Sequence, residues 1–174
     1  SVDSSNAILV RTPRHLHMLS LIWDNIADNA ANALFMQTRS LDYSTYRWNA
    51  FFDANVLSLA EQSPIGVSKP FTATYNGSYN RISGVSFVSD ASNIGLFGTN
   101  RGDLRNIVIT NDFVVDSSHF GIYRTADIVS NDYVSIGALS GVNEGTIENC
   151  AVSGFYLSGE DMTVYAYSNS HVYS

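Results

Sequence analysis

The sequence is poor in charged residues, and lysine is almost absent from it. Charged side chains make up 14% of the 174 residues, against roughly 25% in typical soluble domains. Lys69 is the only lysine, no two arginines lie closer than three positions, and the formal net charge is −7. A surface that follows nucleic-acid phosphates needs clustered Lys and Arg. The composition therefore excludes nucleic acid as an expected partner.

Cysteine and long apolar runs are scarce as well. Cys150 is the only cysteine, so the chain cannot form an internal disulfide, and we expect this residue to be buried as a small apolar side chain. No stretch of 18 or more apolar residues is present, so we expect no membrane insertion. The chain starts at Ser1 without a methionine or a signal-peptide pattern, and we expect it to be processed or to be a piece of a longer protein.

The polar residues that are abundant, mainly Ser, Asn, Thr, Gly and Tyr, are typical of turns and solvated β-surfaces. One segment differs and predicts a helix. Thr12 is a suitable N-cap residue, and Pro13 suits the first helical position. Apolar residues then recur at helical spacing, and residues 28–32 are predicted to form a loop. The apolar face of this helix consists of Leu16, Leu19, Ile22, Trp23 and Ile26.

Short β-like pieces follow the helix. Residues 34–38 and 41–43 alternate in the manner of strands. The stretch 44–60 is aromatic and irregular, and a short helix is one interpretation of its second half, 52–60. We therefore divide the chain into residues 1–62, with a strand, a capping helix and an irregular aromatic segment, and a repeat region at 63–174.

An internal repeat is the most informative feature of the sequence. Residues 94–109 match residues 136–152 when one extra residue is allowed at Ala138. A weaker copy relates residues 82–87 to 104–109 at a distance of 22. The matched pairs of the main repeat lie 43 residues apart and are Gly98 with Gly141, Asn100 with Asn143, Gly102 with Gly145, and Asn106 with Asn149.

This period predicts an all-β fold, a right-handed parallel β-solenoid with a short N-terminal capping helix. A spacing near 22, doubled to 43, is too short for the four strands of a propeller blade and fits one coil of two or three short strands. Coils in such a stack lie about 4.8 Å apart. Residues 77–157 would then form about four coils.

The spacing inside the repeat predicts which side chains face inward. Ile107 and Ile109 lie on the same face of a strand, and so do Val85 with Phe87 and Cys150 with Val152. These apolar residues are expected in the core. Ser86, between two of them, is expected to face outward.

The repeat also predicts a bend in the backbone. Leu104 and Ile107 are three residues apart and cannot share one strand face. Asn106 and Asn149 lie at this bend, where Asn tolerates a left-handed backbone and its amide can bond to a neighbouring coil. Gly84 is expected at the same place one coil earlier.

Two short motifs within the repeat carry a family resemblance. Gly95 to Gly98 reads Gly-Leu-Phe-Gly, and Gly137 to Gly141 is a looser copy. A Gly-x-Ile/Leu-x-Asn element follows each of them, at 102–106 and 145–149. This pattern resembles the GLUG-motif repeats of bacterial surface proteins. Residues 64–77 look like the entry segment of such proteins.

The resemblance implies a location and a role. Related repeats occur in adhesin-like proteins and in the N-terminal regions of immunoglobulin A-cleaving metalloproteases. The implied protein is a non-catalytic extracellular module, secreted or attached to the bacterial cell surface, that acts as an adhesive surface or as a stalk. Its implied partners are host glycans or proteins and other domains of the parent protein. Gly121 to Arg124 is a degraded signature, and residues 158–174 leave the pattern altogether.

Catalytic and metal sites find less support than this structural interpretation. His15 and His17 diverge on a helix, which disfavours joint zinc binding, and no cofactor is expected. Carboxylates on adjacent coils leave a carbohydrate-active β-helix enzyme open, because glycosidases use paired carboxylates. A calcium site at the same turns also stays open, whereas solvated turns are the favoured interpretation. The carboxylates concerned are Asp112, Asp116, Asp127 and Asp132.

Aromatic residues near the start of the repeats form the candidate ligand-binding site. Such side chains can bind a sugar or a protein partner, and they can equally cover the edge and the end of the sheets. The five candidates are Tyr43, Tyr46, Trp48, Tyr75 and Tyr79. The repeat glycines and asparagines are assigned structural roles instead.

These features together favour a non-enzymatic module. The alternatives are a carbohydrate-active enzyme and an accessory N-terminal region of a secreted metalloprotease. Because the open ends of a strand stack invite polymerisation, the helix that begins at Pro13 is expected to cap one end. Removal of residues 1–30 is therefore expected to cause aggregation.

Overall fold

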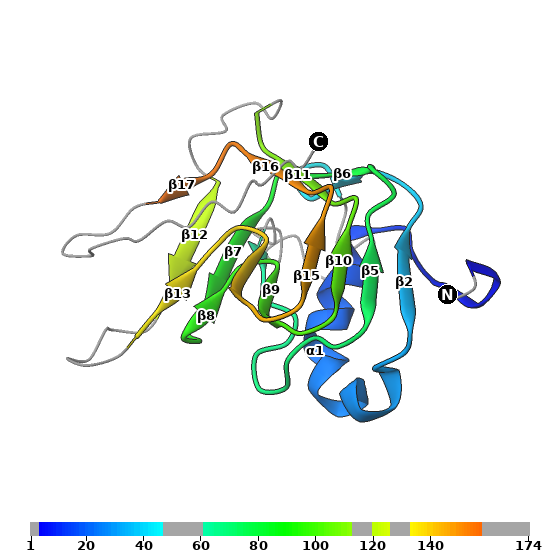
Figure 1. The fold of residues 1–174 in the computed structure, drawn as a ribbon. Helices are drawn as coiled ribbons and strands as arrows, with labels where there is room; N and C mark the ends of the chain where they lie inside the picture. The colour runs from blue at the N-terminus through cyan, green and yellow to red at the C-terminus, as the bar shows by residue number, and fades with distance from the viewer. Residues whose placement is uncertain (1–3, 47–60, 113–119, 126–132, 158–174) are drawn as a thin grey trace, which may run out of the picture.

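The computed structural model describes residues 4–46, 61–112, 120–125 and 133–157. In these residues the protein is β-rich, with short strands in parallel sheets, one α-helix and a short 3₁₀-helix at Ser4–Asn6 (Figure 1). The short helix considered for 52–60 lies outside the described residues. The prediction of a β-rich chain is confirmed.

The chain visits the same sheets in the same order, and we call one such passage a rung. All strand pairings in the described residues are parallel. Strand β1 (Ile8–Val10) precedes the rungs and pairs with β2. Rung 1 contains β2 (Leu34–Gln37), β3 (Leu41–Asp42), β4 (Glu61–Gln62) and isolated bridges at Ile65 and Phe71. Rung 2 contains β5 (Thr74–Asn76), β6 (Arg81–Ser83), β7 (Ser86–Ser89), β8 (Asn93–Ile94) and β9 (Phe97–Asn100). Rung 3 contains β10 (Asp103–Arg105), β11 (Val108–Thr110), β12 (Gly121–Arg124), β13 (Ser135–Ile136) and β14 (Ser140–Asn143). Rung 4 contains β15 (Thr146–Glu148), β16 (Ala151–Ser153) and β17 (Tyr156–Leu157).

Figure 1 shows β2, β5, β10 and β15 side by side, one from each rung. Strands β3, β6, β11 and β16 form a second sheet, and β4, β7, β12 and β17 form a third. Since β2 pairs with β5 and β3 pairs with β6, these sheets continue across the division between residues 62 and 63.

The register of the strands confirms the 43-residue repeat. Leu104 of β10 pairs with Ile147 of β15, at that separation. The extra residue at Ala138 is confirmed as well. Before the insertion, Ile94 pairs with Ile136, 42 residues later in the sequence, and after it Phe97 pairs with Ser140, 43 residues later.

The weaker copy at a distance of 22 is wrong. Ile82 pairs with Ile109 of β11, 27 residues on, and not with Leu104. Short apolar strands on different sheets share the same alternation, so the alignment matched one sheet to another. The 43-residue period is therefore one rung, and residues 77–157 belong to rungs 2 to 4 rather than to four coils.

Most of the predicted inward side chains are confirmed. Val85, Phe87, Ile107 and Ile109 are fully buried, whereas the inward prediction is wrong for Val152, which is exposed, and Cys150 is only half-buried. Ser86, which was expected to face outward, is buried as well, and its hydroxyl accepts a hydrogen bond from the Gly121 backbone N–H of the next rung. This side-chain hydrogen bond thus joins β7 to β12, which also pair through their backbones.

The bend at the asparagines is confirmed. Asn106 and Asn149 have φ of 55° and 54°, the left-handed region that Asn tolerates better than most residues. The Asn149 amide donates to Asn106 Oδ1 at 3.5 Å, and the Asn106 amide donates to Asn76 Oδ1 at 3.0 Å. Gly84 was wrongly assigned to this bend, because it follows β6 and occupies the place that Gly154 occupies after β16.

The helix α1 (Pro13–Ala30) begins where it was predicted and extends through residues 28–30, three residues further than expected. Thr12 is its N-cap residue, but the Thr12 side chain makes no capping hydrogen bond. Leu16, Leu19 and Trp23 are buried as predicted, whereas Ile22 is exposed and was wrongly placed on the buried face.

Trp23 attaches α1 to rung 1. Its ring packs against Phe35 of β2 and against Phe71 at centroid distances of 6.2 and 4.6 Å. Its indole N–H donates to the carbonyl oxygens of Lys69 and Pro70 at 3.2 and 3.1 Å. The helix therefore covers the apolar interior of rung 1, where no earlier rung precedes it.

Candidate functional site

The predicted aromatic platform does not form as expected, because two of its members lie in the core. Tyr43 and Tyr75 are 2% and 0% exposed. The Tyr43 hydroxyl donates to Gln62 Oε1 at 2.6 Å, and the Tyr75 hydroxyl donates to Gln37 Oε1 at 3.2 Å. Burial raises the pKa of both phenols. The prediction of a binding role is wrong for these two residues.

Two buried glutamines, which sequence reasoning missed, explain how the tyrosines are accommodated. A buried polar tip needs a hydrogen-bond partner. Gln37 and Gln62 supply it, and their amide groups also donate to backbone carbonyl oxygens, including those of Arg39 and Leu16. The signal was present, since both glutamines occupy an inward strand position, but the pairing depends on which rungs are stacked.

The other three aromatic candidates are dispersed. Tyr46 is half-buried and packs against the core, and Trp48 lies outside the described residues. Tyr79 is 62% exposed. It lies on the turn between β5 and β6 with φ of 58°, next to Ser78 with φ of 51°, and its backbone N–H donates to the Asn106 carbonyl oxygen at 2.9 Å. Of the four candidates that the structure describes, Tyr79 is therefore the most accessible.

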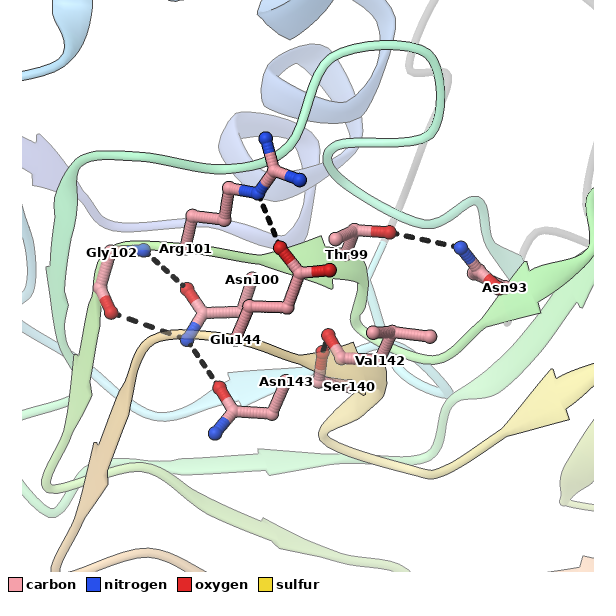
Figure 2. Close-up of polar contacts among 9 residues, drawn as sticks. All are labelled: Asn93, Thr99, Asn100, Arg101, Gly102, Ser140, Val142, Asn143 and Glu144. Carbon is pink, nitrogen blue, oxygen red and sulfur yellow. Dashed lines mark hydrogen bonds and ion pairs between the residues drawn. The ribbon is translucent and has the colours of Figure 1, made fainter.

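A pair of stacked asparagines links rungs 2 and 3 (Figure 2). The Asn100 side chain is fully buried, and its amide donates to Asn143 Oδ1 at 2.7 Å and to the Gly102 carbonyl oxygen at 3.3 Å. The Gly102 N–H donates to Asn100 Oδ1 at 3.1 Å. Asn143 repeats part of this pattern, because its amide donates to the Gly145 carbonyl oxygen at 3.0 Å.

A charged pair runs along the outside of the same turn. The Arg101 guanidinium forms an ion pair with the Glu144 carboxylate of the following turn (Figure 2). Both side chains are about half exposed, so solvent screens the attraction and its contribution to stability is small. The pair nevertheless places opposite charges directly above one another in adjacent rungs.

Steric crowding explains why glycine occupies these positions of the repeat. A Cβ added at Gly102 would lie 2.0 Å from the Ala73 carbonyl oxygen, and one at Gly145 would lie 2.2 Å from the Gly102 carbonyl oxygen. Both contacts are far shorter than any real Cβ contact. The rungs approach so closely at this corner that no larger residue fits without movement. The four remaining repeat glycines are also tight, and they are Gly95, Gly98, Gly137 and Gly141.

The residues considered for catalysis or metal binding serve local structure where they are described. His15 Nδ1 accepts a hydrogen bond from the Arg11 N–H at 3.0 Å. Asp112 follows β11, and its carboxylate accepts a hydrogen bond from the Thr110 hydroxyl at 3.2 Å. Asp116, Asp127 and Asp132 lie outside the described residues. In the described part of the chain, no three His, Cys, Asp or Glu side chains gather where they could hold a metal ion.

Cys150 is half-buried rather than fully buried. Burial raises the pKa of its thiol, and its Sγ lies 3.2 Å from the Glu148 carbonyl oxygen. A raised pKa keeps the thiol protonated near neutral pH, whereas nucleophilic cysteines need a depressed one. The residue therefore behaves as a packing side chain at the last described rung.

Residues 143–149 run from the end of β14 in rung 3 through β15 in rung 4 and lie at the edge of the described strands. In the described residues β14 pairs only with β9, and β15 pairs only with β10. Asn143, Glu144, Thr146, Glu148 and Asn149 are all exposed. Because these exposed polar side chains lie along the outermost of the described strands, we take them as the candidate interaction site.

Comparison with known proteins returned no match. No protein-family model, curated protein sequence or solved structure matches the chain. The resemblance to the surface-protein repeats is therefore carried by the sequence itself, through the short motifs at 95–106 and 137–149 and the entry-like segment at 64–77. No helix among the described residues has the length and apolar character needed to cross a membrane.

Proposed function

We propose that this chain is a non-catalytic extracellular module of a bacterial surface protein, folded as a right-handed parallel β-solenoid with α1 as its N-terminal cap. The observation that carries the proposal is the fixed order in which the chain revisits its sheets, with parallel pairing from rung to rung. A stack of this kind presents long outer surfaces. The position of Trp23 over rung 1 supports the capping role of α1.

The residues with chemical capacity support a structural or adhesive role. The polar groups of Tyr43, Tyr75, Asn100 and Asp112 are engaged in hydrogen bonds that hold strands, rungs or turns together. Contact with a partner would then involve outward turns such as the one that carries Tyr79. The extracellular location is supported by the motif resemblance at 95–106 and 137–149.

An array of glycans and extracellular host proteins tests the adhesive role. Tyr79 is 62% exposed and Tyr133 is 94% exposed, so they form a matched pair of accessible tyrosines. An adhesive surface at the β5–β6 turn predicts binding that is lost in Tyr79→Ala and kept in Tyr133→Ala. A chain that serves only as a stalk predicts that no array member binds.

The enzyme alternative is tested by product release from a panel of acidic polysaccharides. We expect no turnover by the full chain. Turnover that disappears in Asp112→Ala would contradict a non-catalytic module, because it would assign a catalytic task to a carboxylate that here holds a turn. Circular dichroism of the variant would show that the loss does not arise from unfolding.

A further inference from the structure

The turn between β5 and β6 presents an exposed tyrosine on a constrained backbone. Tyr79 is 62% exposed, and it has φ of 58° next to Ser78 with φ of 51°. Left-handed conformations of this kind cost free energy in most residues and persist only where neighbouring bonds fix them. The Ser78 N–H donates to Asn76 Oδ1 and the Tyr79 N–H donates to the Asn106 carbonyl oxygen, both at 2.9 Å. The backbone that carries the Tyr79 ring is therefore held in place before any ligand binds.

One buried glutamine joins this turn to the same corner of rung 1. Gln37 is fully buried, and its amide nitrogen lies within hydrogen-bond distance of three carbonyl oxygens. They belong to Arg39 at 2.9 Å, Asn80 at 3.1 Å and Arg81 at 3.3 Å. The Arg81 N–H donates in addition to Ser40 Oγ at 3.3 Å. The backbones of Arg39 and Arg81 are thus fixed next to each other, although they belong to different rungs.

Arginines recur at this corner from one strand to the next. Arg11 directly follows β1, Arg39 follows β2 by two residues, and Arg81 opens β6. All three are exposed. The Thr38 N–H donates to the Val10 carbonyl oxygen at 3.0 Å, which brings the backbone before Arg11 beside the turn that contains Arg39. We call Arg11, Arg39, Tyr79 and Arg81 the basic corner.

The charge of this corner is opposite to that of the chain. Residues 34–42 and 74–83 contain two arginines and one carboxylate, that of Asp42. The Asp42 carboxylate accepts hydrogen bonds from the hydroxyl groups of the second and third residues after it, at 2.6 and 2.9 Å. Arg11 and Arg39 take part in none of the ion pairs formed among the described residues. Because the whole chain has a net charge of −7, an anion that binds it has to be held by local contacts rather than by overall attraction.

The side chains of the basic corner match an acidic sugar. The planar guanidinium group of arginine binds the oxygens of a carboxylate or a similar anion in pairs. A tyrosine ring supplies a rigid apolar face that suits a sugar ring, at a low cost in conformational entropy. Neighbouring strands lie about 4.8 Å apart, so cations that recur from strand to strand suit a polymer that repeats its acidic groups.

We propose that the basic corner binds an acidic glycan. Arg39 and Arg81 hold its carboxylate or sulfate groups, Tyr79 stacks on one of its sugar rings, and Arg11 extends the site toward α1. The inference rests on the adhesive role in the proposed function and names a ligand class for it.

The test measures binding of three fluorescent probes to the full chain by fluorescence anisotropy. The probes are an oligogalacturonate, which carries carboxylates, its fully methyl-esterified form, which is neutral, and a dextran sulfate oligomer. We expect saturable binding of an acidic probe that weakens at high salt, and no binding of the neutral ester. The acidic probe that binds more tightly identifies the preferred acid group.

Single substitutions assign the binding to the basic corner. Arg39→Gln and Arg81→Gln should each weaken it about 10-fold, because each removes charge-assisted hydrogen bonds. Tyr79→Ala should weaken it to a similar degree, whereas Tyr79→Phe keeps the ring and should bind as the unmodified chain does. Arg101→Gln removes the same charge in front of β10, at the other end of the strands of that sheet, and should leave binding unchanged. Circular dichroism should report the same folded content for each variant.

Several outcomes would overturn the inference. They are the absence of binding to both acidic probes, equal binding of the neutral ester, and an equal loss in Arg101→Gln. A polyglutamate peptide that binds as tightly as the acidic glycans, with no effect of Tyr79→Ala, would instead make the corner a site for acidic polypeptides.

These failures are distinguishable from a failure of the proposed function. Binding of a neutral glycan or a host protein that depends on Tyr79 but not on Arg39 or Arg81 would keep the adhesive role and reject the acidic ligand. Cleavage of the oligogalacturonate would reject a non-catalytic module, while the arginine variants would still report whether the basic corner holds the glycan.

Discussion

The two ends of the strand stack close their apolar interiors in different ways. At the N-terminal end, α1 places Trp23 against Phe35 and Phe71, and all three side chains are buried. At the C-terminal end, Ile147 is half-buried and Val152 is 41% exposed. The comparison shows that the apolar side chains of a rung are fully buried only when another rung or a helix packs over them. A helix supplies the cover at one end, and the described residues supply none at the other.

The largest expected effect comes from removing the cover at the N-terminal end. Trp23→Ala should destabilise the protein by about 4 kcal/mol, because it deletes a fully buried indole, two ring contacts and the donor to Lys69 and Pro70. Val152→Ala at the open end should cost less than about 1 kcal/mol. Urea denaturation of both variants measures the difference. Equal losses would mean that the two ends are closed to the same degree.

Glycine-to-alanine substitutions compare how tightly an inner rung and the last described rung are packed. Gly102→Ala should cost about 3 kcal/mol, because its Cβ would overlap the Ala73 carbonyl oxygen while Gly145 packs from the other side. Gly145→Ala should cost roughly 1 kcal/mol, because rung 4 can move outward. Thermal unfolding of each variant gives the ranking. A larger loss for Gly145→Ala would show that rung 4 is held from both sides.

The stacked asparagines allow the same comparison for polar groups. Asn100→Ala should cost about 2 kcal/mol, because it removes a fully buried amide that donates to the Gly102 carbonyl oxygen and to Asn143 Oδ1. Asn143→Ala should cost less than about 1 kcal/mol, since Asn143 is exposed and Asn100 keeps its bond to Gly102. Free energies of unfolding in urea test the prediction. Similar losses would mean that the two asparagines are equally buried.

The smallest effect concerns Asp42, at the end of β3 in rung 1. Burial by itself would raise the pKa of this carboxyl, but hydrogen bonds from Ser44 and Thr45 outweigh it and hold the pKa below its ordinary value. A lowered folded pKa contributes stability above the unfolded value of about 3.9, and the contribution is lost as pH falls through the folded pKa.

Asp42→Asn should therefore be less stable than the unmodified chain at pH 7 by roughly 0.5 kcal/mol or less, because solvent screens this partly exposed group. The difference should shrink as pH falls below the unfolded value of about 3.9 and through the lowered folded pKa, where the carboxyl becomes protonated. Denaturation over a series of pH values from neutral to acid measures it. A difference that grows on acidification would mean that the sign of the pKa shift is wrong.

Much of the fold followed from local patterns that repeat. The 43-residue register and the insertion at Ala138 could be predicted because the sequence repeats itself. The left-handed bends at Asn106 and Asn149 could be predicted because they depend on a residue and its near neighbours in sequence. The start of α1 at Pro13 belongs to the same class. Helix and turn preferences act over a few residues, so a single sequence reveals them.

The candidate site was less predictable, because it depends on which rungs are neighbours. Tyr43 and Tyr75 were expected on a surface, and they are buried because Gln62 and Gln37 satisfy their hydroxyl groups. A tyrosine side chain suits either the surface or the interior, because it combines an apolar ring with a polar hydroxyl group. Only the partner across the interior decides between them, and that partner comes from a different strand.

The low charge of the chain illustrates the same division. The sequence by itself determined the scarcity of cations, the repeat and the residues available at each turn. Tertiary structure alone decided that Arg101 and Glu144, 43 residues apart, form an ion pair. The physical reason is that parallel strand pairing brings residues one repeat apart into contact in neighbouring rungs. Which strands become neighbours is fixed only when the interior is packed.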